Sequence, residues 1–325
     1  MKRINAFILG ICALGAFTAC ENKDVEFDDF DYQTIYFAKQ TPIRTIVLGN
    51  DDEDDRTLDN QHQFQVYATV GGVWKNKETR QIQVAVDNSL CAGRTYEDGS
   101  AVTPLPEGHY RMLGNTISIK PDSVMGCVTV QLTDAFFADP KSKELHYVLP
   151  LRIQTAKDSL LEGKDYTLYA VKYVNRFTGA WISHGTDEID LNGQKSTQVR
   201  EAEYLERNEI RYLTTRSMSQ CNYALQTQVN ADNTLKVLNA NLILTYDEAG
   251  NITVTTDTPD CEASGSGKWE EKAAKQAWGG KDRDQITLSY TLTYNYTDGG
   301  VKKYKTIKSN DILVMRDRQA KLETF

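Results

Sequence analysis

Apolar and polar residues alternate in short runs along most of the chain, beginning near residue 34. In Gln81 to Val86 the alternation is clean, because Ile82, Val84 and Val86 share one face. A period of two places successive side chains on opposite faces of a strand, so such runs predict half-buried β-strands. Similar runs occupy residues 34–38, 44–48, 63–70, 116–119, 127–132, 146–153 and 166–173, and no helical periodicity competes with them.

The spacing of these strands predicts an immunoglobulin-like β-sandwich over residues 33–175. In residues 176–325 hairpin signals follow one another closely, for example at Asp247 to Asn251 and at Thr297 to Gly300. Consecutive hairpins without a crossover predict an up-and-down meander, which avoids exposed edges best by closing into a barrel. Only residues 269–278 have a briefly helical pattern. The glycine–lysine segments Gly265 to Lys268 and Gly279 to Lys281 are predicted as turns.

The strand predicted from Ile286 to Tyr296 separates two kinds of side chain. Its even-numbered residues are apolar or aromatic and include Tyr290 and Tyr294, whereas its odd-numbered residues are small and polar, such as Thr287 and Ser289. One face therefore belongs to the core and the other meets water. The two inward tyrosines either pack the core or line a cavity, since small barrels can hold one ligand.

A glycine and a tryptophan stand at the start of the meander, at Gly179 and Trp181. This spacing resembles the first signature of calycin (lipocalin-like) barrels, in which the glycine allows a close passage of the chain and the indole plugs one end. The resemblance implies a basic residue of the last strand over that indole, a cation–π contact of about 0.5–2 kcal/mol. Arg316 and Arg318 are the candidates for it. The alternative is a core tryptophan in another kind of β-barrel.

The N-terminus has the three parts of a secretory signal peptide. Lys2 and Arg3 precede an apolar stretch from Ala6 to Phe17, and small residues then lead to Cys20. We predict that residues 1–19 are a lipoprotein signal peptide and that acylated Cys20 anchors the protein in outer-membrane lipid, facing the cell exterior. Residues 20–32 are acidic and form either a solvated tether or an export signal for the outer surface.

The chain carries 37 basic and 45 acidic residues, and loss of the signal peptide makes it more acidic still. This balance argues against nucleic acid as a partner.

The cysteines that remain after loss of the signal peptide and lipidation of Cys20 permit one disulfide inside each domain, Cys91–Cys127 and Cys221–Cys261. Buried free thiols are the alternative. The acidic loop Asp51 to Asp55 either collects calcium or is simply solvated, and its spacing favours the second.

No motif for catalysis or for a cofactor is present. The chain has neither a G-x-S-x-G nor an H-E-x-x-H sequence, and its histidines lack ligand-like spacing, so we predict no catalytic residue, cofactor or metal site. A carboxylate pair for glycoside hydrolysis is spatial, so the sequence leaves a glycosidase open.

Several segments carry family resemblances. Residues 105–110, 116–121, 147–153 and 173–175 make the first domain similar to the Bacteroidetes domain of unknown function 1735. Residues 278–284, the tyrosine-rich strand that follows, and residues 313–318 make the second similar to domain of unknown function 5627. The resemblance implies a surface lipoprotein from a polysaccharide-utilisation or adhesin-like setting. It implies no catalytic residues.

These observations favour a non-catalytic lipoprotein that binds glycan at the cell surface. Aromatic rings stack on sugar faces, and Trp269 and Trp278 lie in a turn-rich segment that can present them, with Tyr290 and Tyr294 as further candidates. Alternatively, both indoles cap the barrel core. The rival functions are an adhesin or assembly subunit that binds protein, and a calycin-type carrier of a small apolar ligand.

Overall fold

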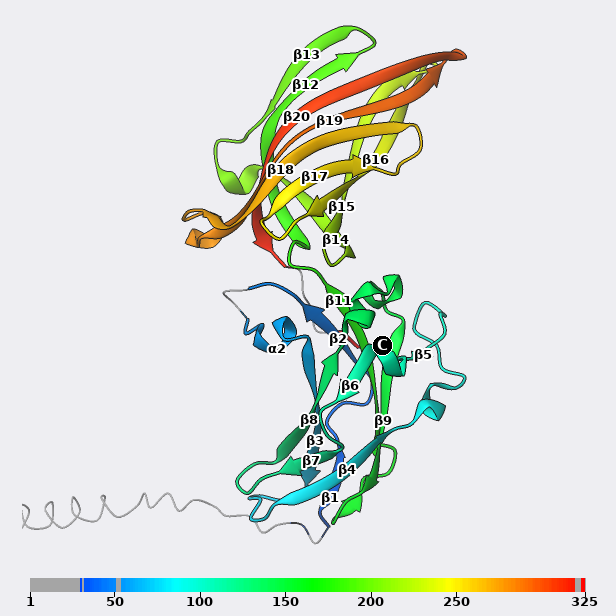
Figure 1. Ribbon diagram of the computed structural model, residues 1–325, viewed down its shortest axis with the longest axis vertical. Coiled ribbons are helices and arrows are strands. Elements are labelled where there is room, and N and C mark those ends of the chain that lie inside the picture. The colour runs from blue at the N-terminus through cyan, green and yellow to red at the C-terminus, as the bar shows by residue number, and fades with distance from the viewer. Residues whose placement is uncertain (1–29, 31, 51–53, 319–322, 325) are drawn as a thin grey trace, which may run out of the picture.

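The computed structural model describes residues 30, 32–50, 54–318 and 323–324. The signal peptide, Cys20 and nearly all of the tether lie outside the described residues. The described chain is almost entirely β-structure, as predicted, and its two parts stack end to end along the long axis (Figure 1). Among the described residues no helix is long and apolar enough to cross a membrane.

The first part is a sandwich of two sheets. One sheet has the strand order β10-β1-β3-β8-β6 and the other β21-β2-β11-β9-β4-β7, with β5 beside β9. The strands are β1 (Thr34–Phe37), β2 (Pro42–Val47), β3 (Gln63–Gly71), β4 (Arg80–Val86), β5 (Thr103–Pro104), β6 (Tyr110–Met112), β7 (Thr116–Ile119), β8 (Met125–Leu132), β9 (Tyr147–Thr155), β10 (Ser159–Leu160), β11 (Tyr166–Val174) and β21 (Glu323–Thr324).

Alternating residues of both sheets meet in one core. Ile35, Phe64 and Val130 contribute from the first sheet, and Ile82 and Leu149 from the second, all fully buried. Short helical segments connect the strands: α2 (Thr57–Asn60), α3 (Asp134–Ala138), η1 (Asn88–Cys91), η2 (Glu107–His109) and η3 (Pro140–Lys143). The β-strands predicted from alternation are thus present, and the strands that the sequence missed are very short.

The second part is an antiparallel meander that closes on itself. Its strands are β12 (Gly179–Leu191), β13 (Gln194–Arg200), β14 (Glu209–Ser217), β15 (Gln220–Ala231), β16 (Thr234–Tyr246), β17 (Asn251–Thr256), β18 (Cys261–Ala274), β19 (Arg283–Asp298) and β20 (Val301–Asp317), with η4 (Leu205–Arg207) and η5 (Trp278–Gly280) between them. Strand β12 pairs with β20 from Ala180 to Leu191, which joins the two ends of the sheet. The up-and-down barrel predicted from the hairpins is therefore present.

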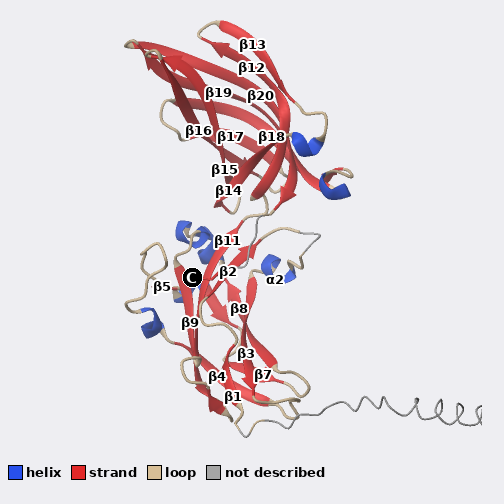
Figure 2. Ribbon diagram, turned by 180° about the vertical axis from the view of Figure 1, so that it is seen from behind, coloured by secondary structure: helices blue, strands red, loops and turns tan. Residues whose placement is uncertain are grey.

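The barrel is tightly closed only at the end nearest the sandwich. Strand β12 pairs with β14 as far as Ser183 and with β13 from Gly185 onwards, so the β12–β13 hairpin splays away from β15 (Figures 1 and 2). At the far end the β15–β16 turn is held to the β19–β20 turn. There the Gly299 amide donates to Asp232 Oδ1 at 2.8 Å and the Asp232 amide to Asp298 Oδ1 at 2.9 Å.

Two local predictions in the barrel are wrong. Gly265 and Gly267 lie inside strand β18 and not in a turn, and the segment predicted as helical continues β18 to Ala274 before it turns at η5. Both glycines face Tyr290 and Leu288 on β19, and a Cβ on Gly265 would lie 2.5 Å from the Tyr290 Cβ. Glycine is needed there because the neighbouring side chains already fill the space.

The two parts are joined at two points. Asn175 is buried between them, where its side-chain amide donates to the Ser217 and Gln220 carbonyls at 2.8 and 2.9 Å. Residues 323–324, assigned by sequence to the barrel, instead pair with β2 of the sandwich. Arg318 donates to the carbonyls of Asn175 and Leu48, at 2.7 and 2.8 Å, so its side chain holds the end of the barrel to the sandwich.

Candidate ligand-binding groove on the barrel

Gly179 and Trp181 close the narrow end of the barrel. Trp181 is fully buried in the barrel core, and its indole nitrogen donates to the Phe177 carbonyl at 3.0 Å. Gly179 has a φ of 154°, and a Cβ there would lie 2.5 Å from the Asp317 carbonyl oxygen. The close passage of the chain and the buried indole implied by the sequence are both present.

The predicted cation–π partner of Trp181 is elsewhere. Arg316 lies over the ring of Trp278, with its guanidinium carbon 5.2 Å from the ring centre, and Arg318 donates to backbone carbonyls at the domain junction. The reason is strand geometry. Odd-numbered residues of β20, such as Leu313 and Met315, point into the barrel, so Arg316 must point outward.

The four aromatic residues predicted to bind glycan do not form one platform. Tyr290 and Tyr294 are 6% and 2% exposed and point into the barrel core, where both also line a cavity of about 60 Å³. Trp269 lies at the closed end, with its ring 4.2 Å from the Arg176 guanidinium carbon and in edge contact with Phe177. Trp278, half-buried on η5, stands apart from the other three; its binding of glycan stays a prediction.

A network of charged and hydroxyl groups occupies the centre of the barrel. Arg200 donates to both carboxylate oxygens of Asp187, at 2.7 and 3.0 Å, and also contacts Asp311. The other Asp311 oxygen accepts from the hydroxyls of Tyr223 and Tyr290, at 3.2 and 3.1 Å. Burial lowers the pKa of Arg200, but its bonds to the two carboxylates outweigh burial and raise the pKa overall. Burial raises the pKa of Tyr290 well above its usual value.

The space left beside this network is small. The cavity measures about 60 Å³ and is lined by Arg211, Leu225 and Ile307 as well as the network itself. Pockets that hold small ligands usually measure about 300–1,000 Å³. A filled, charged interior does not suit a small apolar ligand, so the geometry does not support the carrier function.

A larger hollow lies on the outside of the same wall, across β12, β20, β19 and β18. It measures about 580 Å³, within the usual range for ligand sites. The outward residues that line it are mainly small and polar, namely Thr186, Ser266, Thr287, Ser289 and Asn310, and apolar Ile312 lies among them. At its rim His184 Nδ1 lies 4.0 Å from a carboxylate oxygen of Glu201. We call this hollow the outer groove.

The floor of the outer groove is a neutral hydrogen-bonding surface, and the Glu201 carboxylate lies at its rim. Hydroxyl groups both donate and accept, and the Asn310 amide offers two donors and an acceptor. Sequence reasoning singled out none of these residues as functional. A signal was nevertheless present, because the alternation in β19 already placed Thr287 and Ser289 on the solvent face.

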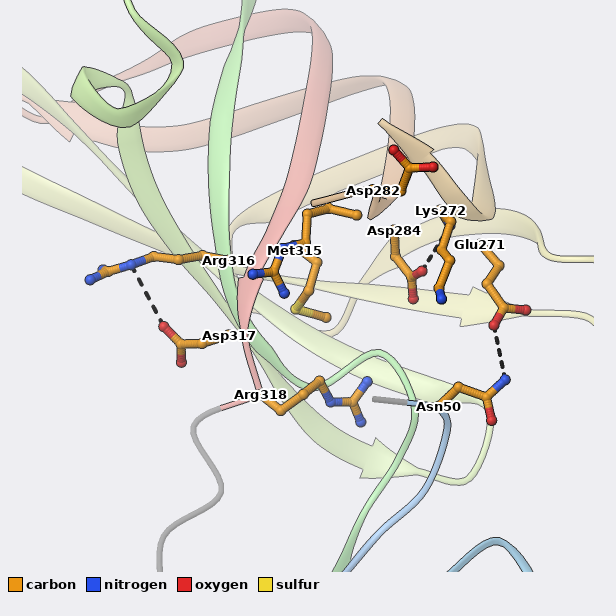
Figure 3. Close-up of a pocket in the computed structure, with 10 residues that line it drawn as sticks. Asn50, Glu271, Lys272, Asp282, Asp284, Met315, Arg316, Asp317 and Arg318 are labelled. Carbon is orange, nitrogen blue, oxygen red and sulfur yellow. Dashed lines mark hydrogen bonds and ion pairs between the residues drawn. The ribbon is translucent and has the colours of Figure 1, made fainter. Parts of the chain in front are cut away.

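The cleft between the two parts is small, and hydrogen bonds form among the residues that line it. It measures about 70 Å³, and across it the Asn50 side-chain amide donates to Glu271 Oε1 at 2.9 Å (Figure 3). Asp284 accepts a hydrogen bond from the Lys272 amide at 2.9 Å, and burial raises the pKa of this carboxyl group. The Asn50–Glu271 hydrogen bond therefore links the two parts across this cleft.

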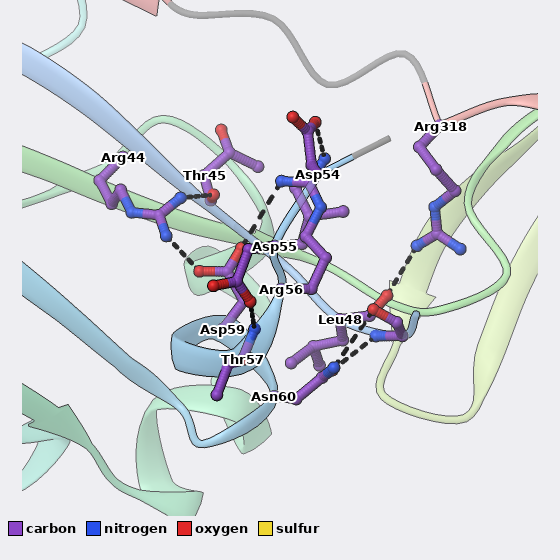
Figure 4. Close-up of polar contacts among 12 residues, drawn as sticks. Arg44, Thr45, Leu48, Asp54, Asp55, Arg56, Thr57, Asp59, Asn60 and Arg318 are labelled. Carbon is purple, nitrogen blue, oxygen red and sulfur yellow. Dashed lines mark hydrogen bonds and ion pairs between the residues drawn. The ribbon is translucent and has the colours of Figure 1, made fainter. Parts of the chain in front are cut away.

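The described part of the acidic loop is also engaged within the protein. Asp55 Oδ1 accepts from the Thr57 amide at 2.9 Å, Asp54 pairs with Arg56 at 2.7 Å, and buried Asp59 pairs with Arg44 (Figure 4). Residues 51–53 lie outside the described residues. The calcium alternative gains no support from the carboxylates that are described.

The four cysteines of the described chain are free, so the disulfide alternative is wrong. Cys221 lies at the closed end of the barrel, where its thiol donates to Asn175 Oδ1 at 3.3 Å. Cys261 lies on another strand and donates to the Asn239 carbonyl at 3.7 Å. The two thiols of the barrel therefore have different hydrogen-bond partners.

Comparison with known proteins shows that the chain is similar to solved proteins from Bacteroides. The family model for domain of unknown function 5627 matches residues 176–319, and a model described as an N-terminal domain matches residues 30–160. A solved protein of unknown function from Bacteroides ovatus is 34% identical, with a TM-score of 0.82 over 91% of this chain and 99% of its own. The chain belongs to that protein's family. The resemblance to domain of unknown function 5627 is thus confirmed, whereas the name 1735 for the first domain is not.

More distant structures share less. An auxiliary nutrient binding protein from Bacteroides thetaiotaomicron is 13% identical, with a TM-score of 0.39 over 83% of this chain and 90% of its own. A candidate carbohydrate binding protein from Bacteroides ovatus is 12% identical, with a TM-score of 0.31 over 87% of this chain and 98% of its own. None of these three is described as an enzyme. No curated protein matches the chain.

Proposed function

We propose that this protein is a lipid-anchored, non-catalytic carbohydrate-binding protein and that the outer groove is its binding site. The observation that carries the proposal is the groove itself, a hollow of about 580 Å³ lined mainly by serine, threonine and asparagine side chains, with His184 and Glu201 at its rim. Sugars present many neutral hydroxyls, which such groups satisfy without the cost of burying a charge. A shallow open site also suits a ligand that extends beyond the protein.

The test is to fill the groove. Ser289 is exposed on its floor, so Ser289→Tyr places a ring where the ligand would lie while leaving the barrel core untouched. Thr214→Tyr is the matched control, because Thr214 is an exposed small polar residue of β14, outside the groove. Migration of the three proteins is compared in native gels containing soluble xylan, mannan, starch or mixed-linkage glucan.

We expect at least one polysaccharide to retard the wild type and the control about equally. The affinity of Ser289→Tyr for that polysaccharide should be lower by about tenfold or more. Retardation unaffected by Ser289→Tyr would place binding elsewhere, and no retardation by any polysaccharide would count against carbohydrate binding. Release of reducing sugar by the wild type would show that the protein is an enzyme.

The proposed location at the outer membrane is tested separately. A multiply acylated cysteine holds a protein firmly, because each buried methylene contributes about 0.8 kcal/mol. Cys20→Ser should therefore move the protein from the membrane fraction to the soluble fraction. Protease treatment of intact cells should remove the wild-type protein. Cys20→Ser protein that stays with the membranes would contradict lipidation at this residue, and full protection from protease would contradict exposure to the exterior.

A further inference from the structure

A second hollow lies on the outer face of the barrel, next to the outer groove. It measures about 400 Å³ and is lined by side chains of β12, β13 and β20: Glu188, Asp190, Lys195, Thr197, Thr306 and Lys308. Its volume is again that of a ligand site. We call it the distal hollow, because it lies farther from the sandwich along β12 and β20.

The two hollows share the same pair of strands. On the outer face the cross-strand pairs His184–Ile312 and Thr186–Asn310 belong to the outer groove, and the next pairs, Glu188–Lys308 and Asp190–Thr306, belong to the distal hollow. Residues two apart on a strand point to the same side. At about 3.3 Å per residue, the run from His184 to Asp190 extends about 20 Å, which is longer than one sugar ring.

No buried wall separates the hollows. The first side chains beyond the outer groove are Glu188 and Lys308, which form an ion pair at 3.8 Å with 65% and 57% of their side chains exposed. Exposed ion pairs contribute little, about 0–1 kcal/mol, so these side chains can move aside at small cost. Their charged groups can then accept and donate hydrogen bonds, which are stronger than those between neutral groups.

We propose that the outer groove and the distal hollow form one track that binds a linear carbohydrate chain several sugar units long. The inference rests on the proposed function, because it takes the outer groove as a carbohydrate site. It adds the class of ligand: a chain polymer that lies along β12 and β20, and not a monosaccharide or a branched tip. Affinity should therefore increase with chain length until both hollows are filled.

The experiment measures affinity against length. Oligosaccharides of two to six units, derived from whichever polysaccharide retards the wild type, are titrated by calorimetry into the wild type, Thr197→Tyr, Ser289→Tyr and Thr214→Tyr. Thr197 is exposed on β13 and lines only the distal hollow. We expect Thr197→Tyr to weaken binding of the six-unit chain about tenfold and to leave the two-unit chain unchanged. Ser289→Tyr should weaken both.

The outcomes separate the two proposals. The track proposal is wrong if the wild type binds two-unit and six-unit chains with equal affinity, or if Thr197→Tyr binds the six-unit chain as tightly as the wild type does. In either case weaker binding by Ser289→Tyr would still support the outer groove as a carbohydrate site. If Ser289→Tyr binds every chain as the wild type does, the outer groove is not the site and both proposals fail.

Discussion

The two faces of the barrel wall are built from the same strands but have opposite chemistry. On β20, Asp311 points inward, is 2% exposed and shares its carboxylate with Arg200 and two tyrosines, whereas its neighbour Asn310 points outward into an open groove. The inside packs apolar and aromatic side chains around a buried charged network, which leaves a cavity of only about 60 Å³ beside it. At the outer groove the outside holds mainly small polar side chains and has room for a ligand. Large aromatic residues are therefore a poor guide to the proposed binding surface.

The strongest test of this comparison replaces Asp311 and Asn310 in turn. Asp311→Leu leaves two buried tyrosine hydroxyls and part of the Arg200 guanidinium without their acceptor. Removing one partner from a buried charged network costs about 3–5 kcal/mol, so the free energy of unfolding should fall by that amount. Asn310→Leu should change it by less than about 0.5 kcal/mol. Urea denaturation followed by tryptophan fluorescence measures both, and equal losses would remove the distinction between the faces.

A second pair tests the same distinction on β18. A Cβ on inward Gly267 would lie 2.3 Å from the Thr287 carbonyl oxygen and 2.6 Å from Leu288 Cδ2. Gly267→Ala should thus destabilise the barrel by about 1–3 kcal/mol through overpacking. Ser266→Ala, one residue away and facing outward, serves as the control and should be close to neutral. If Gly267→Ala proves equally neutral, the interior is less tightly filled than its contacts indicate.

The remaining prediction concerns stability at alkaline pH. Burial raises the pKa of the Cys221 thiol to about 12, from an ordinary value of 9.0. Between these values the unfolded chain loses the proton and the folded chain keeps it, so stability should fall as pH rises above about 9. Cys221→Ala has no thiol and should show a shallower decline between pH 9 and 11, measured by urea denaturation. Parallel declines would show that other groups account for the alkaline loss.

Alternation predicted the architecture because it reports directly on which side of a strand is buried. It therefore located the eight main strands of the sandwich and the inward face of β19. It failed at Gly265 and Gly267, where glycine reflects crowding by residues more than twenty positions later in the chain. It also missed the outer groove, because a hollow depends on how β12, β18, β19 and β20 are arranged in space. The contacts of Arg318 at the junction also involve residues far away in the sequence. The sequence shows only that residue 318 is charged, and it does not identify the partners.

The pairing of residues 323–324 with β2 gives the barrel a second attachment to the sandwich, made by hydrogen bonds, beside the covalent link at Asn175. A single linker lets one part turn about its axis, whereas a second attachment resists that turning. The orientation of the barrel's outer face relative to the sandwich is therefore restrained. A ligand bound along β12 and β20 would then lie in a set direction relative to the rest of the molecule, so a pull on that ligand would reach the sandwich as a turning force on the whole protein.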